Sequence, residues 1–384
     1  MILIVAPYSP PNRHGSVHLG ASRKLEAIIS VLSKLDDRLV LVNSAHNDVR
    51  ASPLSCSEAI VGGVALTEIT PPTCTRRGLG KLKNIFDVEK VLSTIEALGT
   101  PRFIWFYNGY AFEMRLAAKA QKRFGVPMIL EFEDWHFSRG RGLNPKPYID
   151  YLFWRLARRY MAGTFAVNQH LVGKMGTLPG PVELLPGIVP KILADIASEF
   201  PPFNKGASPI HVGFFGGLSH EKGADVVLQL AASLPEGYVL HVTGAGPMVA
   251  KFESAANELA GRLCFYGRVD DAKLYQLISK CDVMLNPHSS IEEMNNGVFP
   301  FKVIEAIASG RLLISTAVPS QGLEDVLVGV RFVERSVDAF RDAIISAEQY
   351  YREHLPRIAQ GAEIANKRFG EAAILEKIKE MAAI

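Results

Sequence analysis

The sequence has only four cysteines, and none of them form a CxxC pair. Cys56, Cys74, Cys264 and Cys281 lie far apart along the chain. This spacing argues against a disulfide framework and against a cysteine-based zinc site. It indicates reduced thiols, and we therefore expect a cytoplasmic protein.

Long apolar runs, repeats and low-complexity tracts are also missing. The longest apolar runs have seven or eight residues, whereas a helix needs about 18 to cross a bilayer. The opening residues MILIVAPYSPP lack the basic start and the small-residue cleavage site of a signal peptide, so we expect a first strand there.

The composition is that of a globular protein with more than one core. Apolar residues make up 48% and charged residues 21% of 384 residues, and this length favours two domains. Residues 1–200 hold 24 Lys and Arg against 17 Asp and Glu, whereas residues 201–384 hold 18 against 22. A basic first half suggests an anionic partner, although an uneven scatter of surface charge remains an alternative.

Short β-rich runs alternate with helical patterns along the whole chain, which is typical of parallel α/β units. We expect strands near 2–6, 38–43, 64–69, 102–107, 127–132 and 164–167, and again near 210–215, 238–243, 263–266, 282–286 and 311–315. The fold class is α/β, with two Rossmann-like doubly wound domains, 1–195 and 196–361, that face a cleft. The segment 192–210 is the best linker candidate, and we expect a helix over 362–384 that packs back on the first domain.

Three loops of the second half have the composition of phosphate-binding turns. In FFGGLSHEKG, a strand ends at Gly216 and Gly217, and a helix starts after Gly223 with Lys222 beside it. Glycines admit a ligand close to the backbone, and a helix start attracts anions. A capped turn with a solvated lysine is the alternative. HVTGAGPM, with Gly244 and Gly246, is a weaker signal of the same kind.

The third loop opens a short helix. In NNGVFPFKVIEAIASGRLLIST, Pro300 fits the first helical position and Gly310 ends the helix. Lys302 and Glu305 share one face at a spacing of three residues. The simplest interpretation of this pair is a surface ion pair worth less than about 1 kcal/mol.

Together these loops resemble the GT-B glycosyltransferases, and within them the large retaining group called family 4. The matching stretches are FFGGLSHEKG, HVTGAGP, CFYGRVDDAKLYQLISKCDVMLNPH and GVFPFKVIEAIASGRLLIST, which cover about 211–316. The resemblance is thinner in the first half, where APYSPPNRHG, VPMILEFEDW and VELLPGIVP look like the strand ends of the family's first domain.

The resemblance implies a site for a nucleotide-sugar donor. Glu305 would accept hydrogen bonds from the ribose hydroxyls, and Lys222 would neutralise the diphosphate as a catalytic residue. The remaining donor-binding residues that it implies are Gly216, Gly217, Gly244, Gly246, Val269, Asn296, Gly297, Val298 and Phe299.

Three departures from the family pattern concern this site. Gly217 stands where the family usually has an arginine, and Gly297 stands where it has the first of two glutamates. Tyr107 and Asn108 occupy the approximate place of the family's first-domain histidine. The second departure makes the donor sugar uncertain, and Glu292, Glu293, Asn295 or Asn296 are candidates to replace the missing carboxylate.

The first half offers residues for the acceptor or for phosphate. Arg13, Gly15 and Arg23 lie in or after a long loop between the first strand and its helix, where a guanidinium next to a helix start makes an anion site. Asp134 follows another strand and matches an aspartate common in relatives, so we expect it to orient an acceptor hydroxyl or act as a base. A solvated basic loop and ordinary loop contacts are the alternatives.

We therefore expect a glycosyltransferase that moves a sugar from a nucleotide-sugar, most readily a UDP- or GDP-sugar, to an acceptor hydroxyl with retention. The acceptor is a glycan, a lipid-linked molecule or a small molecule. A nucleotide-sugar 2-epimerase and a binding protein without catalysis are the alternatives. No DxD motif has a suitable strand context, so we expect neither a metal nor another cofactor.

The remaining expectations concern partners. The stretch YIDYLFWRLARRYMAG, residues 148–163, could lie on the anionic inner face of a membrane, or it could be a core helix with a basic outer face. The basic residues are not interleaved with aromatic residues in a recognised module, so we expect no nucleic-acid partner. The oligomeric state stays open.

Overall fold

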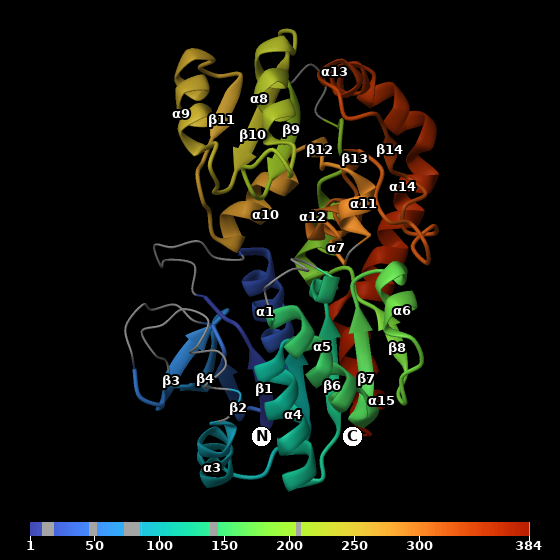
Figure 1. Ribbon diagram of the computed structural model, residues 1–384. Coiled ribbons are helices and arrows are strands. Elements are labelled where there is room, and N and C mark those ends of the chain that lie inside the picture. Colours follow the sequence, from blue (N-terminus) through green and yellow to red (C-terminus); the bar gives the residue numbers. More distant parts are fainter. Residues whose placement is uncertain are drawn as a thin grey trace. The chain divides into compact units, whose positions relative to one another are not determined.

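The structure is a computed structural model of the chain, and it describes residues 1–9, 19–45, 52–72, 85, 87–138, 145–204, 209–295 and 297–383. The chain forms two compact units, Met1–Ile188 with Ala372–Ile384, and Val189–Glu371. Each unit is a sheet with helices on both faces (Figure 1). Within the described residues, no helix has the length and apolar character needed to cross a membrane.

The sheet of the first unit has eight strands in the order β3-β4-β2-β1-β5-β6-β7-β8. All neighbouring strands are parallel except the hairpin of β3 and β4. The strands are β1 (Ile2–Ala6), β2 (Leu39–Asn43), β3 (Ser55–Val61), β4 (Val64–Thr70), β5 (Ile104–Tyr107), β6 (Met128–Phe132), β7 (Met161–Ala166) and β8 (Val182–Leu184).

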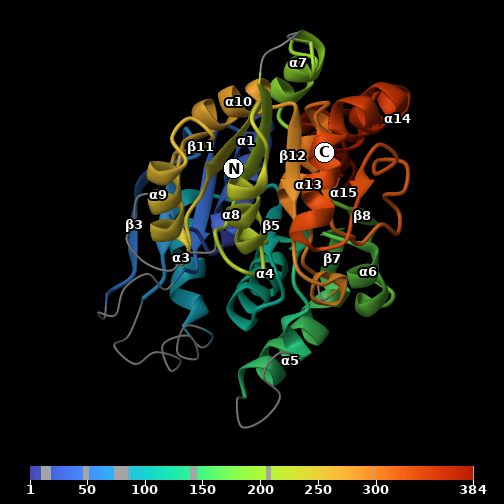
Figure 2. The same cartoon turned by 90° about the horizontal axis from the view of Figure 1, so that it is seen from above.

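The helices of the first unit divide between the two faces of this sheet. They are α1 (Leu19–Leu32), α3 (Val88–Leu98), α4 (Ala111–Phe124), α5 (Lys146–Ala157), α6 (Gln169–Met175) and α15 (Glu371–Ala382), with short 3-10 turns at His136–Ser138 and Arg158–Tyr160. Helices α1 and α15 share one apolar core with the central strands, whereas α4 packs between α3 and α5. In Figure 2, α5 projects outward from the other helices of this unit.

The second unit has a fully parallel sheet of six strands in the order β11-β10-β9-β12-β13-β14. Numbered within the unit this is 3-2-1-4-5-6, the order of dinucleotide-binding Rossmann sheets. The strands are β9 (Ile210–Phe215), β10 (Tyr238–Thr243), β11 (Leu263–Phe265), β12 (Val283–Asn286), β13 (Leu312–Ser315) and β14 (Arg331–Phe332).

The helices of the second unit also form two layers. They are α7 (Lys191–Glu199), α8 (Ala224–Ser233), α9 (Val249–Glu258), α10 (Asp271–Lys280), α11 (Ile291–Met294), α12 (Phe301–Ala308), α13 (Val337–Ile345) and α14 (Ala347–Phe369). Helix α8 packs between α9 and α13 on one face, and α7 packs with α10, α12 and α14 on the other. The first part of the expected linker over 192–210 is therefore a packed helix, with Leu193 and Ile196 buried.

Arg311 explains why α7 belongs to the second unit. Its guanidinium is 2% exposed and donates hydrogen bonds to the carbonyl oxygens of Cys281, Ser309, Ile196 and Phe200. A buried guanidinium is costly unless its donors are satisfied, and these carbonyls satisfy them. The boundary between the units consequently lies at residues 188 and 189.

The helix expected over 362–384 is two helices. Residues up to Phe369 complete α14 in the second unit, and α15 packs in the first unit, where Met381 lies against Gly163 of β7. The chain turns at Gly370, whose ψ of 151° leaves the helical region. An added Cβ there would lie 2.3 Å from the carbonyl oxygen of Asn366, so only glycine fits this turn.

Candidate functional site

The predicted donor-binding residues of the second unit follow its strands at one edge of the sheet. Because all six strands are parallel, the loops after β9, β10, β11 and β12 leave the sheet at the same edge. The strand order reverses between β9 and β12, and ligands of such sheets bind at this reversal. The loop after β9 holds Gly216, Gly217 and Lys222, so the sequence places these residues at the reversal.

Backbone hydrogen bonds join these loops to one another. The N–H of Leu218 donates to the carbonyl oxygen of Ala245 at 2.9 Å, and the N–H of Gly244 donates to that of Gly267 at 2.7 Å. On the other side of β9, the N–H of Ser289 donates to the carbonyl oxygen of Glu221 at 2.8 Å. The four loops therefore form one connected rim.

The glycines of this rim have two different roles. Gly244 and Gly246 have φ angles of 142° and 153°, and an added Cβ would lie 1.7 Å from the carbonyl oxygen of Gly216 and 2.5 Å from that of Leu218. They are required for the packing of two loops. At Gly217, in contrast, an added Cβ would have Cγ of Lys222 as its nearest neighbour, at 3.4 Å. No described residue blocks a side chain there, and the position is open beside a lysine.

Lys222 lies in a small polar cluster with His288 and Glu221. Its ammonium donates to Nε2 of His288 at 3.0 Å and to Oε1 of Glu221 at 2.7 Å. Burial, then Lys222 and Lys302, lower the pKa of His288 to about 4. The imidazole is therefore neutral at pH 7 and accepts a hydrogen bond from the ammonium, so it orients Lys222 without competing with it for an anion.

Lys302 and Glu305 do not form the surface ion pair that their spacing suggested. Glu305 is 4% exposed, and Nζ of Lys302 is buried without a hydrogen-bond partner among the described residues. The Lys302 ammonium lies 4.1 Å from the centroid of the Phe214 ring in β9. The surface interpretation was wrong because α12 is covered by neighbouring elements, α14 and α7 among them.

The other predicted donor residues lie in the same rim or in the turn before α12. Val269 lies between Gly267 and the start of α10, and it is half-buried. Gly297 has a φ of 113° and is followed by half-buried Val298 and buried Phe299. Asn296 lies outside the described residues.

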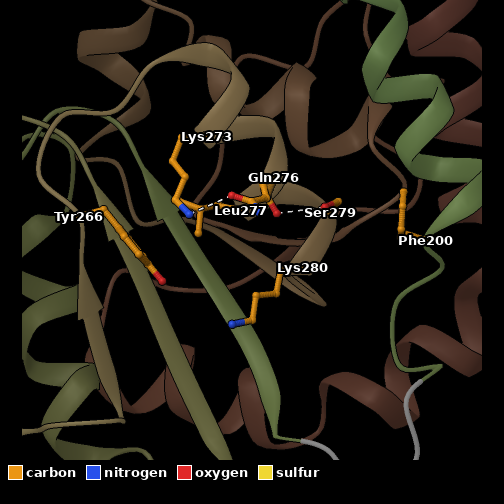
Figure 3. A pocket seen from close by; sticks show the side chains of 7 residues that line it. All are labelled: Phe200, Tyr266, Lys273, Gln276, Leu277, Ser279 and Lys280. Atoms are coloured by element: carbon orange, nitrogen blue, oxygen red, sulfur yellow. Dashed lines mark hydrogen bonds between the residues drawn. The ribbon is translucent and has the colours of Figure 1, made fainter.

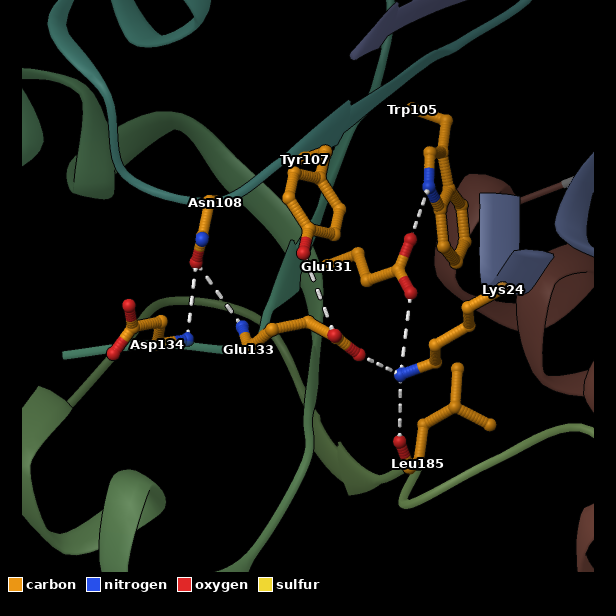
Figure 4. A network of polar contacts seen from close by, with 8 residues as sticks. All are labelled: Lys24, Trp105, Tyr107, Asn108, Glu131, Glu133, Asp134 and Leu185. Atoms are coloured by element: carbon orange, nitrogen blue, oxygen red, sulfur yellow. Dashed lines mark hydrogen bonds and ion pairs between the residues drawn. The ribbon is translucent and has the colours of Figure 1, made fainter. Parts of the chain in front are cut away.

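The first unit holds a buried ionic network at the carboxyl end of β6 (Figure 4). The ammonium of Lys24, from α1, lies 3.2 Å from Oε1 of Glu131 and also contacts the Glu133 carboxylate. It donates to the carbonyl oxygen of Leu185 at 2.9 Å, and Nε1 of Trp105 donates to Glu131 at 3.1 Å. Burial lowers the pKa of Lys24, but the charges of Glu133 and Glu131 outweigh burial and raise it.

Asn108 organises the loop that holds the predicted residue Asp134. It is buried, with a φ of 58°. Its Oδ1 accepts hydrogen bonds from the backbone N–H groups of Glu133 and Asp134, both at 3.1 Å, and Figure 4 shows it between the two. The hydroxyl of Tyr107 donates to Oε2 of Glu133 at 3.4 Å. Asn108 thus holds the backbone at Asp134, and Tyr107 contacts the side chain of Glu133 beside it.

The predicted phosphate-side residues are described only in part. Arg13 and Gly15 lie outside the described residues. Arg23 lies in α1 next to Lys24 and is half-buried. Among the residues that the structure covers, no three His, Cys, Asp or Glu side chains are grouped as metal ligands would be.

A pocket of about 320 Å³ lies elsewhere in the second unit, along α10 (Figure 3). Its lining residues are Phe200, Tyr266, Lys273, Gln276, Leu277, Ser279 and Lys280. None of the predicted site residues lines it, and its lysines are solvent-facing residues of an ordinary helix. It includes Tyr266 of the loop after β11 but none of the residues at the reversal between β9 and β12.

His288 of the rim and Lys302 of α12 had no role in the sequence-based prediction of the donor site. His288 follows β12 in the stretch DVMLNPH, and only its contact with Lys222 shows what it does. Lys302 was noticed, but its burial was not. The sequence feature that could have predicted the burial of Lys302 is the apolar character of α12 on nearly all sides, which is typical of a buried helix.

Comparisons with known proteins show which family and which fold the chain resembles. Residues 209–349 match a sequence model of the family described as glycosyl transferases group 1. No curated protein matches the sequence.

Solved glycosyltransferase structures have the same fold over the whole chain. HepE from Anabaena in complex with UDP is 17% identical, with a TM-score of 0.67 and coverage of 100% of this chain and 99% of HepE. Sucrose-phosphate synthase from Thermosynechococcus elongatus is 14% identical, with a TM-score of 0.65 and 98% of each chain covered. The lipopolysaccharide outer core galactosyltransferase WaaB in its apo form is 14% identical, with a TM-score of 0.60 and coverage of 99% and 98%. Residues 209–349 are therefore similar to the glycosyl transferases group 1 family, within a chain that has the GT-B fold.

Proposed function

We propose that this protein transfers a sugar from a nucleotide-sugar to an acceptor hydroxyl. The observation that supports this most directly is the position of Lys222, whose side-chain stem lies beside the open backbone of Gly217 at the strand-order reversal. A cation held by a neutral imidazole, next to glycines and before a helix start, suits a diphosphate. The complexes of HepE with UDP and with UDP-glucose favour a UDP-sugar as donor.

In this proposal each predicted residue has a separate task. Lys222 stabilises the departing nucleoside diphosphate, which develops negative charge as the sugar leaves. Glu305 accepts hydrogen bonds from the ribose, and the backbone near Val269 contacts the base. Gly297, Val298 and Phe299 line the sugar together with Asn296. Asp134 in the first unit orients the acceptor hydroxyl, and the configuration at the anomeric carbon is retained.

Lysine and backbone dipoles can carry the charge of the leaving group without a divalent cation. We therefore propose metal-independent transfer, in which EDTA leaves the rate unchanged. Loss of activity in EDTA that Mg²⁺ or Mn²⁺ restores would contradict metal independence. It would not contradict sugar transfer from a nucleotide-sugar.

Ligand-induced thermal stabilisation tests the donor directly. A ligand that binds the folded state raises the melting temperature by mass action. We expect UDP-sugars to raise it more than GDP-, ADP- or dTDP-sugars, and acceptor-dependent release of UDP to follow. The configuration of the product, read by NMR of its anomeric proton, tests retention. No stabilisation by any of these nucleotide-sugars would overturn the proposed function.

The same measurements separate the two alternatives. A 2-epimerase would convert a UDP-sugar without any acceptor. A transferase would release UDP at an appreciable rate only when the acceptor is present. A binding protein without catalysis would be stabilised by the donor but would leave it intact with every acceptor tried. Gly217 and Gly297 are the reason for testing this second alternative, because they stand where the resembled family has an arginine and a glutamate.

The outer face of α5 supports a membrane surface as the setting of the reaction. Tyr148, Leu152 and Leu156 are between 48% and 57% exposed, and Arg155 and Arg159 are exposed beside them. A helix that exposes both apolar and basic side chains suits an anionic lipid surface. We propose a cytoplasmic protein that binds the inner membrane face through α5 and uses a lipid-linked or glycan acceptor there.

Vesicle co-sedimentation tests this setting. We expect the protein to sediment with phosphatidylglycerol vesicles but not with phosphatidylcholine vesicles, and the double variant Leu152→Asp, Leu156→Asp to stay in solution. Equal binding of the natural protein and the variant would contradict a role for α5.

A further inference from the structure

The amine nitrogen of Lys302 is buried and has no hydrogen-bond partner within the part of the chain that the structure describes. Its closest described contact of an electrostatic kind is the face of Phe214, 4.1 Å away. A lysine is almost never buried unless it is paired, and a cation–π contact offsets only part of the cost of removing an ammonium from water.

The groups around Lys302 make the missing partner an anion. Burial, then Lys222, lower the pKa of Lys302 to about 7, and His288 faces the same two lysines. The Glu221 carboxylate is 53% exposed and is already bonded to Lys222. Glu305, one turn along α12, does not hydrogen-bond the Lys302 nitrogen. The rim and the start of α12 thus bring together basic groups with no buried carboxylate in contact with them, as far as the described residues go.

Both lysines border the same short loop. A Cβ added to Gly216 would lie 3.8 Å from Cδ of Lys302, and one added to Gly217 would lie 3.4 Å from Cγ of Lys222. Two adjacent glycines therefore each face one lysine stem, from α12 on one side and from the loop after β9 on the other. A small ligand with two neighbouring anionic groups fits this arrangement, and a diphosphate has that chemistry.

We propose that Lys302 is a second binding residue for the diphosphate of the donor, beside Lys222, and that its amine takes up a proton when the diphosphate binds. This inference rests on the proposed function, since it concerns the same ligand. In the free protein the amine rests over Phe214, where burial and the neighbouring ammonium disfavour the charged form. The diphosphate supplies the missing negative charge, so binding and protonation stabilise each other.

Isothermal titration calorimetry with UDP at pH 8 tests this coupling. Free UDP is fully ionised at this pH, so proton uptake measured in two buffers of different ionisation enthalpy comes from the protein. We expect uptake of about 0.9 proton per UDP, because a group with a pKa of about 7 is about nine-tenths neutral at pH 8. UDP affinity of the natural protein should fall about tenfold per pH unit above 7.

The variant Lys302→Met keeps the length and the apolar stem of the side chain but removes the titrating nitrogen. We expect it to bind UDP at least roughly tenfold more weakly and to show no proton uptake. Lys251→Met is the matched control, because Lys251 is an exposed lysine of α9 in the same unit, and it should behave as the natural protein does. If Lys302→Met does not fold, Lys302→Gln replaces it in the same experiment, because it also removes the titrating amine.

The possible results separate the two proposals. UDP binding and proton uptake that are unchanged in Lys302→Met, or a natural protein whose UDP affinity is flat between pH 7 and 9, would overturn the role of Lys302 and leave the proposed function intact. A natural protein that binds none of UDP, GDP, ADP and dTDP would overturn the proposed function itself, and the inference with it.

Discussion

The ammonium of Lys222 donates a 3.0 Å hydrogen bond to Nε2 of His288, across the reversal of strand order between β9 and β12. This contact requires a lone pair on Nε2, and the pKa of His288 of about 4 keeps that lone pair available at neutral pH. A neutral histidine therefore fixes the direction of the lysine that we assign to the diphosphate.

Replacing His288 should weaken donor binding without changing the charge of the site. In His288→Leu the Lys222 ammonium loses one acceptor, and a hydrogen bond of this kind contributes about 0.5–1.5 kcal/mol. We expect the Kd for UDP to rise roughly two- to tenfold, as measured by calorimetry at pH 7.5. A variant that binds UDP as tightly as the natural protein would show that His288 does not position Lys222.

Lys222→Ala and Glu305→Ala should each lower kcat/KM at least roughly tenfold, because each removes a charge-assisted hydrogen bond to the donor. Steady-state kinetics with the donor found by thermal-shift screening measures the effect. Circular dichroism and the melting temperature show whether each variant is folded. Unchanged turnover in both folded variants would contradict the donor site. For Lys222 the loss should appear mainly in kcat, since the lysine acts on the departing diphosphate.

The buried network of the first unit makes a prediction about stability. Lys24→Met leaves the carboxylates of Glu131 and Glu133 without their shared cation, and breaking a buried ion pair from one side costs about 3–5 kcal/mol. We expect a loss of this order in the free energy of unfolding measured with urea. The double variant Lys24→Met, Glu131→Gln should recover part of it, because a neutral amide replaces one unpaired charge. If the double variant were no more stable than the single one, the network would not be held by charge.

Lys302 makes stability depend on pH in a definite direction. Burial, then Lys222, lower its pKa from 10.5 to about 7 in the folded protein. Between these two pH values the unfolded chain binds one more proton at Lys302 than the folded chain does. The free energy of unfolding therefore falls as the pH is lowered from 10.5 to 7, and above pH 10.5 Lys302 no longer lowers it.

Lys302→Met should consequently be more stable than the natural protein at pH 7, and the difference should shrink steadily toward pH 10. Urea denaturation at intervals of one pH unit measures it, with Lys251→Met as the control that stays level. A difference between Lys302→Met and the natural protein that does not change with pH would mean that Lys302 does not titrate in this range.

Most of the parallel strands were predictable because each is a short apolar run between turn residues, as in 2–6 and 210–215, whereas the three-residue strand β8 was not expected. The edge strand β3 was not expected, because most of its residues are exposed and its sequence lacks a clear strand pattern. It forms a strand through its backbone hydrogen bonds with β4. Likewise β14 has two residues, too few to give a pattern. Helical spacing identified the common face of Lys302 and Glu305, but spacing does not say which other elements will cover that face.

The sequence by itself determined the alternation of strands and helices, the glycine-rich turns after β9 and β10, and the position of Lys222 beside them, because these depend on residues close together in the chain. Only the tertiary structure decided that His288 meets Lys222, that the amine of Lys302 is removed from solvent, and that Asn108 holds the backbone of Asp134. Those relationships join residues from separate elements, and burial, which sets their charge and direction, is a property of the packed chain.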